Sequence, residues 1–207
     1  MTQKIEIGRL LRANTSQFVV GCRVSQADAP SFGALVRVDL GGGYQVYGLI
    51  WDIRIDDDGI VRQLVTANNV DEDTIRDNRT FRNVPLEMGV LAVGYRENGD
   101  ASRGIVRHLL PPRPPLSLDV IYLCNADELR EFTSAGRFGY FRHLLRNADV
   151  PVGELLAAHL KQAHEAHCAA GNLKWSEQAT KELIVLLRDD YSTLMAVLSA
   201  VGDALEI

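Results

Sequence analysis

The sequence predicts an α+β protein with a small antiparallel β-barrel at its N-terminus and an α-helical region at its C-terminus. Short segments that alternate between apolar and polar residues dominate the first half of the chain, with Gly- and Asp-rich turns between them. A proline-rich segment follows at 111–115, after which the apolar residues recur at helical spacing. We therefore expect a barrel over 1–110, a linker over 111–117 and a helical domain over 118–207.

The strand predictions rest on period-two alternation and on turn residues. Strands are expected over 5–10, 18–20, 36–40, 47–55, 60–66 and 86–95. Gly41 to Gly43 can adopt the positive φ angles of a tight connection between two of them. Gly89 and Gly94 are expected to bend the last strand. The alternation in 47–55 places five side chains on one face: Tyr47, Leu49, Trp51, Ile53 and Ile55.

The second half of the chain predicts helices. Two short ones are expected over 126–132 and 138–146, and a longer one from Pro151 to about Ala170. Ser176 is a candidate cap for a single last helix. Its apolar positions fall on one stripe, which makes this helix amphipathic: Leu183, Leu187, Tyr191, Leu194, Leu198 and Val201.

Composition and charge restrict the class of protein. The net charge is -5 and is uneven, because cations and acids balance through Pro115 whereas acids exceed cations beyond it. Such a chain lacks the broad positive field that dominates non-specific DNA binding. The three cysteines have no CxxC spacing and fit reduced thiols. No apolar run approaches the length of a membrane span, so we expect a cytoplasmic protein that does not contact membranes.

The sequence carries no catalytic motif for nucleotide hydrolysis or for nucleophilic hydrolysis. The chain has neither the GxxxxGK[ST] loop that cradles nucleotide phosphates nor the GxSxG turn of hydrolases. The run Gly41 to Gly43 lies between two predicted strands rather than before a helix, which favours a hairpin over a phosphate loop. We therefore expect no enzyme activity and no cofactor.

Two clusters are candidate ligand sites. His164, His167 and Cys168 lie at helical spacing on one face and are donors that zinc accepts, although one helix does not easily converge three ligands on an ion. Local packing is the favoured interpretation, as it is for His159. The second cluster is Arg76, Arg79 and Arg82, which lie at every third position. If their segment is helical, they would form a row that binds phosphate. Local ion pairing is the favoured alternative.

Three strand phrases resemble a known family. Three segments are similar to strands of the HAS barrel: Ile7 to Leu10, Gly48 to Ile53, and Val93 to Tyr95 ahead of the prolines. This is the N-terminal barrel of HerA-type DNA-translocating ATPases, related to that of the ATP synthase catalytic subunits. The resemblance covers about the first 110 residues and rests on strand patterns, not on catalytic signatures. It implies an assembly role, but the P-loop domain that would follow in a HerA-type chain is absent from this sequence.

Two functional hypotheses follow. The first is a non-catalytic docking or oligomerisation module, accessory to an ATPase or nuclease that processes DNA, with nucleic acid contacted only indirectly. The alternative is an OB-like barrel that binds single-stranded nucleic acid directly. In that case Trp51 and three tyrosines would stack on bases: Tyr44, Tyr47 and Tyr95.

Overall fold

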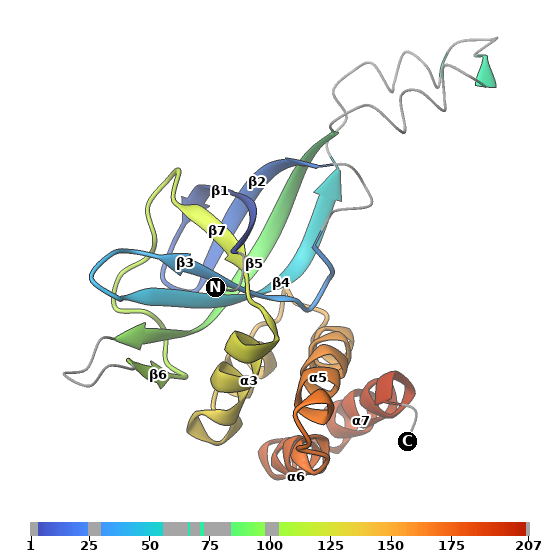
Figure 1. Cartoon of the computed structure of the whole chain (residues 1–207). Coiled ribbons are helices and arrows are strands. Elements are labelled where there is room, and N and C mark those ends of the chain that lie inside the picture. The colour runs from blue at the N-terminus through green and yellow to red at the C-terminus, as the bar shows by residue number, and fades with distance from the viewer. Residues whose placement is uncertain are drawn as a thin grey trace.

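The computed structural model describes residues 4–24, 30–55, 66, 71–72, 84–97 and 104–205 (Figure 1). The strands in these ranges are β1 (Ile5–Ala13), β2 (Gln17–Val24), β3 (Leu35–Asp39), β4 (Gln45–Ile55), β5 (Val84–Glu97), β6 (Ile105–Arg107) and β7 (Val120–Leu123). The helices are α3 (Ala126–Ser134), the short 3-10 helix η2 (Gly136–Phe138), α4 (Phe141–Leu145), α5 (Val152–Ala169), α6 (Trp175–Leu186) and α7 (Tyr191–Leu205).

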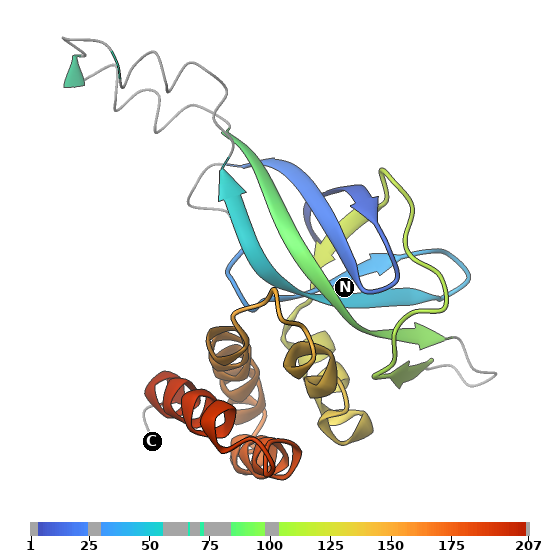
Figure 2. The same cartoon turned by 180° about the vertical axis from the view of Figure 1, so that it is seen from behind.

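The strands confirm the predicted antiparallel barrel. They pair in the order β2-β1-β7-β3-β4-β5, and a further pairing between β2 and β5 closes the cylinder. The short strand β6 pairs only with the end of β5 and lies outside the closed ring. Closure satisfies the backbone groups that open sheet edges would leave unpaired. The helices gather at one end of the barrel, as both views show (Figures 1 and 2).

Strand β7 corrects the predicted end of the barrel at residue 110. It lies beyond the prolines, in the range assigned to helices, and it pairs with both β1 and β3. The segment 111–117 is not a free linker either, since Pro111 and Pro115 are buried and Leu118 N donates to Leu10 O. The prediction missed β7 because its four apolar residues, shortly before a helix, fit a short strand and a helical turn equally well.

Bulges in β4 and β5 correct the expected single face of residues 47–55. Trp51 is an extra residue opposite β5, and Val93 is an extra residue opposite β4. Because a bulge reverses the alternation, Tyr47 and Leu49 contact the helices whereas Ile53 packs towards the barrel interior. Gly89 and Gly94 lie next to these irregularities, where bends were expected. The predicted strand at 60–66 falls almost entirely outside the described residues.

The helices follow the predicted order, with one correction. Asn125 caps α3 in a reciprocal capping box with Glu128. The expected single last helix is divided into α6 and α7, and α6 begins at Trp175 without a side-chain cap. The break is stabilised by Asp190, whose carboxylate accepts from Thr193 N at 3.1 Å and Thr193 Oγ1 at 2.6 Å. An apolar stripe that continues across the break concealed it.

Two hydrophobic clusters form the core of the described residues. One cluster fills the barrel interior, and a second joins the outer face of β4 and β5 to the helices. Phe132 of α3 is fully buried there, with its ring 5.0 Å from Tyr47 and 5.2 Å from Tyr140. Burial of rings at this boundary favours a frame in which the helices do not move freely against the barrel.

Polar contacts reinforce the same boundary. The buried side chain of Arg37 on β3 pairs with Glu128 of α3 at 2.7 Å. His159 of α5 is fully buried and bridges Gly33 O at 3.1 Å and Tyr140 Oη at 3.1 Å. Since a carbonyl oxygen only accepts, His159 Nδ1 donates to Gly33, which leaves Nε2 to accept from Tyr140. The prediction that His159 is a packed core residue is confirmed.

Candidate docking surfaces

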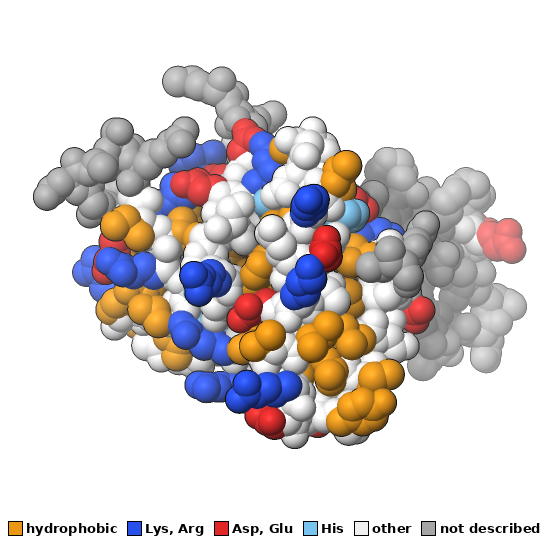
Figure 3. All heavy atoms as spheres, turned by 90° about the horizontal axis from the view of Figure 1, so that it is seen from below, with side chains coloured by type: hydrophobic (Ala, Val, Ile, Leu, Met, Phe, Trp, Pro, Cys, Tyr) orange, Lys and Arg blue, Asp and Glu red, His pale blue; other side chains and the backbone are white. Residues whose placement is uncertain are grey.

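Apolar side chains lie exposed where α6 ends and α7 begins. Five consecutive apolar residues from Leu183 to Leu187 cover more than one helical turn, so burial of Leu183 and Leu187 leaves the three between them facing outward. Val185 is 58% exposed and Tyr191 is 73% exposed. Figure 3 shows apolar side chains gathered on this helical end. We call this set the helical patch: Ile184, Val185, Leu186, Tyr191 and Met195.

A second exposed apolar feature lies between the prolines and β7. Leu116 is 72% exposed and Leu118 is 70% exposed, although the backbone around them is firmly held. Asp119 accepts from Leu116 N at 2.7 Å, and Leu118 N donates to Leu10 O at 2.8 Å. Ser117 Oγ donates to Leu11 O at 3.2 Å. We call residues 116–119 the leucine turn.

Leu118 adopts a strained backbone conformation. Its φ angle is 73°, in the left-handed region that glycine and asparagine occupy more readily than leucine. Such strain costs on the order of 1 kcal/mol and persists only where surrounding contacts impose it. The hydrogen bonds to β1 supply those contacts. The result is an apolar side chain held rigidly in solvent.

The two surfaces differ in charge. Strand β1 with the connection 109–119 holds three arginines, Arg9, Arg12 and Arg113, against two acids, Glu6 and Asp119, for a net charge of +1. Residues 175–205, which include α6 and α7, hold Lys181 and Arg188 against Glu177, Glu182, Asp189, Asp190 and Asp203, for a net charge of -3. Arg9 pairs with Glu6 at 3.6 Å and Arg12 pairs with Glu87 of β5 at 3.8 Å, so the surroundings of the leucine turn are close to neutral. The helical patch lies in an acidic region.

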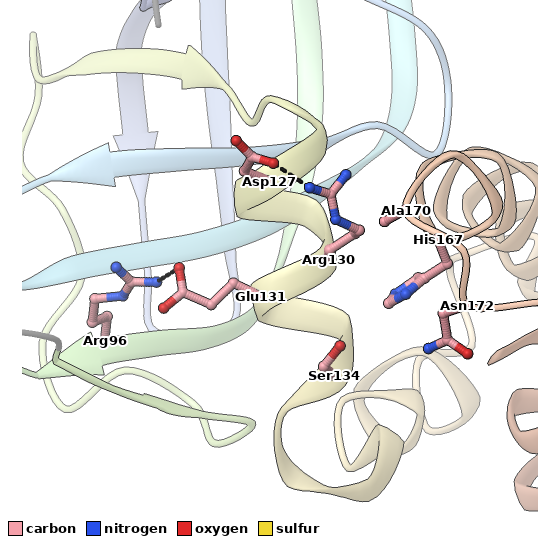
Figure 4. Close-up of a pocket in the computed structure, with 8 residues that line it drawn as sticks. All are labelled: Arg96, Asp127, Arg130, Glu131, Ser134, His167, Ala170 and Asn172. Carbon is pink, nitrogen blue, oxygen red and sulfur yellow. Dashed lines mark hydrogen bonds and ion pairs between the residues drawn. The ribbon is translucent and has the colours of Figure 1, made fainter. Parts of the chain in front are cut away.

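A pocket of about 550 Å³ lies over α3, between β5 and the end of α5 (Figure 4). Its charged side chains form two ion pairs: Arg96 with Glu131 at 2.5 Å, and Arg130 with Asp127. The remaining lining residues are Ser134, His167, Ala170 and Asn172. Because each guanidinium already has a carboxylate partner, the pocket is charge-balanced and does not favour an anion.

His167, at the edge of this pocket, is uncharged at neutral pH. Burial lowers its pKa to about 4, with nearby Arg130 acting in the same direction. Thr133 Oγ1 donates to Leu129 O at 2.7 Å, so the 2.8 Å contact between Thr133 Oγ1 and His167 Nε2 uses a hydrogen from the imidazole. The imidazole also stacks on the Trp175 ring at 4.6 Å between centroids. These contacts give His167 a structural role.

The three candidate zinc ligands, His164, His167 and Cys168, do not converge on one point. His167 bonds to Thr133 of α3, whereas the Cys168 sulfur lies 3.4 Å from His164 Nε2 along the same helix. Within the described ranges, no group of three or more histidine, cysteine or acidic side chains is arranged to hold a metal ion. The helical spacing was read correctly, but packing directs His167 towards α3.

The aromatic residues proposed for base stacking lie mainly in the core. Tyr47 is 1% exposed and Tyr95 is 6% exposed. Trp51 is half-buried against the helices, and its Nε1 is buried. The Tyr44 ring lies between Tyr95 and the guanidinium of Arg113, at 5.7 Å and 5.2 Å. The first two rings therefore have no free face for a base.

The predicted arginine row, Arg76, Arg79 and Arg82, lies outside the described residues. Of the helical patch, the predicted apolar stripe includes only Tyr191, and the leucine turn was not predicted. The signal for the helical patch was present in the uninterrupted apolar run 183–187, which one buried stripe cannot accommodate. The leucine turn had no comparable signal, because its exposure depends on tertiary hydrogen bonds to β1.

Comparison with protein-family models and with curated proteins finds no match to this chain. In the described part of the chain, no helix combines the length and the apolar character needed to cross a bilayer.

Proposed function

We propose that this chain is a non-catalytic docking and assembly module that acts through its surfaces. The observation that carries the proposal is the exposure of apolar side chains, led by Val185 and Tyr191, on a frame in which one hydrophobic cluster joins the barrel to the helices. Large apolar side chains at the centre of a contact contribute most of the binding free energy when they leave water. A rigid frame lowers the ordering cost of presenting them.

The proposal extends to the type of partner. A closed antiparallel barrel followed by helices, together with the strand phrases described above, supports descent from a HerA-type chain that lacks its ATPase domain. On this basis the partner is an ATPase or nuclease that processes DNA, and the chain is an accessory protein of the cytoplasm. The acidic helical half supports indirect contact with DNA through that partner.

Affinity purification of the full chain from its native cell, with mass identification of co-eluting proteins, tests this function. We expect one stoichiometric partner that is lost with Val185→Lys and retained with Ile105→Lys. Ile105 is a matched control because it is 55% exposed on β6, outside both apolar surfaces. A monomeric chain that recovers no partner, or a partner retained by both variants, would contradict the proposed docking role of the helical patch.

A further inference from the structure

We infer that a pocket between the barrel and α4 binds a small organic phosphate, with two guanidiniums holding the phosphate and an apolar wall holding the organic part. The pocket has a volume of about 480 Å³, which is within the usual range for small-molecule sites. The inference goes beyond the docking function, because the described residues that line this pocket include none of the helical patch or of the leucine turn.

The pocket lies where the barrel meets the helices. Ser16, which precedes β2, lines it together with Leu91 and Ala92 of β5. Ala92 N donates to Ser16 O at 2.8 Å, so the start of β2 and the middle of β5 hold each other at this wall. The opposite wall consists of α4 and its connection to α5. Boundaries between packed units of this kind are common places for ligand sites.

Two arginines on the helical wall have no acidic partner. Arg142 lies on α4, and Arg146 follows directly after this helix, four residues later. Among the described residues neither guanidinium forms an ion pair, whereas Arg96 and Arg130 of the pocket over α3 both do. An unpaired guanidinium keeps its full charge and a planar set of donors that matches phosphate and carboxylate groups. This wall therefore attracts anions.

The backbone of His108 holds the helical wall in place. His108 O accepts a hydrogen bond from Arg142 Nη2 and another, at 3.2 Å, from His143 Nε2. A guanidinium has five N–H donors, so Arg142 keeps others for a ligand. Arg142 is half-buried and Arg146 is exposed. The fold thus orients one guanidinium, and the second lies at the open rim of the pocket.

Asn147 adds a neutral donor to the same wall. Its Oδ1 accepts from Asp149 N at 3.1 Å, and within the described ranges its Nδ2 has no hydrogen-bond partner. Asp149 itself lines the pocket, so its charge belongs in the balance. Arg142 and Arg146 against Asp149 give the lining a net charge of +1 while His143 is neutral. The positive charge therefore persists when the acid in the lining is included.

The donor set favours a phosphate over a carboxylate. One guanidinium can pair with both oxygens of a carboxylate, whereas the three terminal oxygens of a phosphate monoester can accept from two guanidiniums and from Asn147 together. The apolar part of the lining includes Leu91, Ala92 and Leu110, which suits an organic substituent better than a free ion. The pocket therefore fits a phosphate monoester that carries an apolar group.

His143 provides a local reporter of binding. Burial lowers its pKa, and the charges of Arg142 and Arg146 act in the same direction. A bound phosphate would offset these two positive charges, so the pKa of His143 should rise on binding. Asp149 in the lining and the neighbouring imidazole of His108 also face this region. Both are present with and without ligand, so neither accounts for a change.

The test uses the full-length chain and phenyl phosphate, in which a phosphate monoester carries an apolar ring. Calorimetric titration at neutral pH should show one binding site, and Arg146→Gln should weaken binding by at least about tenfold. Arg188→Gln is the matched control, because it also removes one positive charge, and its 73% exposed side chain lies between α6 and α7, outside the pocket. It should bind phenyl phosphate like wild type.

Two further probes separate the parts of the ligand. Benzoate carries the same ring on a carboxylate, and inorganic phosphate lacks the ring, so each should bind less tightly than phenyl phosphate by about tenfold. The pKa of His143, followed by NMR, should rise when phenyl phosphate is added to wild type. The inference is overturned if phenyl phosphate does not bind, if Arg146→Gln and Arg188→Gln weaken binding equally, if benzoate binds as tightly, or if the pKa of His143 does not change.

Discussion

Replacement of Gly33 by alanine should destabilise the fold by about 3 kcal/mol through a clash between the barrel and α5. Gly33 has a φ of +80°, where alanine costs on the order of 1 kcal/mol. An added Cβ would lie 2.8 Å from Ala158 Cβ and 2.8 Å from His159 N, distances that require α5 to move. Overpacking of this kind costs roughly 1–3 kcal/mol, and displacement of α5 weakens the hydrogen bond from His159 to Gly33 O by about a further 1 kcal/mol.

Gly41→Ala is a matched control for this prediction. Gly41 also has a φ of +80°, but an added Cβ would meet no atom within 4 Å. Both substitutions stiffen the unfolded chain equally, by roughly 0.4–1 kcal/mol, so their difference isolates the packing of the barrel against α5. Urea unfolding should place Gly33→Ala about 2–4 kcal/mol below Gly41→Ala. Equal stabilities would refute the close approach of residue 33 to α5, and with it the rigid frame.

Three further predictions concern the same frame. Trp51→Phe leaves Trp175 on α6 as the one tryptophan, and Trp175→Phe leaves Trp51 on β4. Because one hydrophobic cluster joins the barrel to the helices, the urea transitions of the two variants, followed by fluorescence, should have the same midpoint after correction for the stability of each variant. Separate midpoints would contradict this coupling. Burial lowers the pKa of His108 and of His159 to about 4, so the unfolded state binds more protons below about pH 6.5. The free energy of unfolding should therefore be at its full value above that pH and fall as the pH drops towards 4, by up to about 3 kcal/mol for each histidine. His159→Gln should reduce the slope of stability against pH in this range by about one proton. An unchanged slope in calorimetry would disprove the lowered pKa of His159. Finally, Leu118→Asn should leave the free energy of unfolding within about 1 kcal/mol of wild type or raise it, because relief of the left-handed strain offsets the little packing that Leu118 provides. A larger loss in urea unfolding would show that Leu118 supports the fold.

The barrel was predictable because its information is local. Alternation in 36–40 and 47–55, with Gly41 to Gly43 between them, determines a hairpin, and the three glycines adopt positive φ angles of 80°, 56° and 73° as expected. Strand β7 was not predictable in the same way. Its four residues form a strand because β1 and β3 lie on either side, and the sequence alone does not reveal those neighbours.

The candidate surfaces were less accessible to sequence reasoning than the fold. The face of Ile53 depends on a bulge at Trp51, which the strict alternation of 47–55 conceals. The role of His159 depends on Gly33, 126 residues earlier in the chain. The exposure of Leu118 depends on hydrogen bonds to β1, and leucine is a residue for which positive φ is not expected. Each feature arises from tertiary contacts, which override local preference.

The most direct test of the account is photo-crosslinking in the native cell, with a photoreactive side chain placed either at Val185 of the helical patch or at Ile105 of β6. Both positions are similarly exposed, at 58% and 55%, so solvent access does not distinguish them. If the chain acts by docking through the helical patch, a discrete protein adduct should form at Val185 and not at Ile105. Equal labelling at the two positions, or no adduct at Val185, would contradict a docking function for this surface.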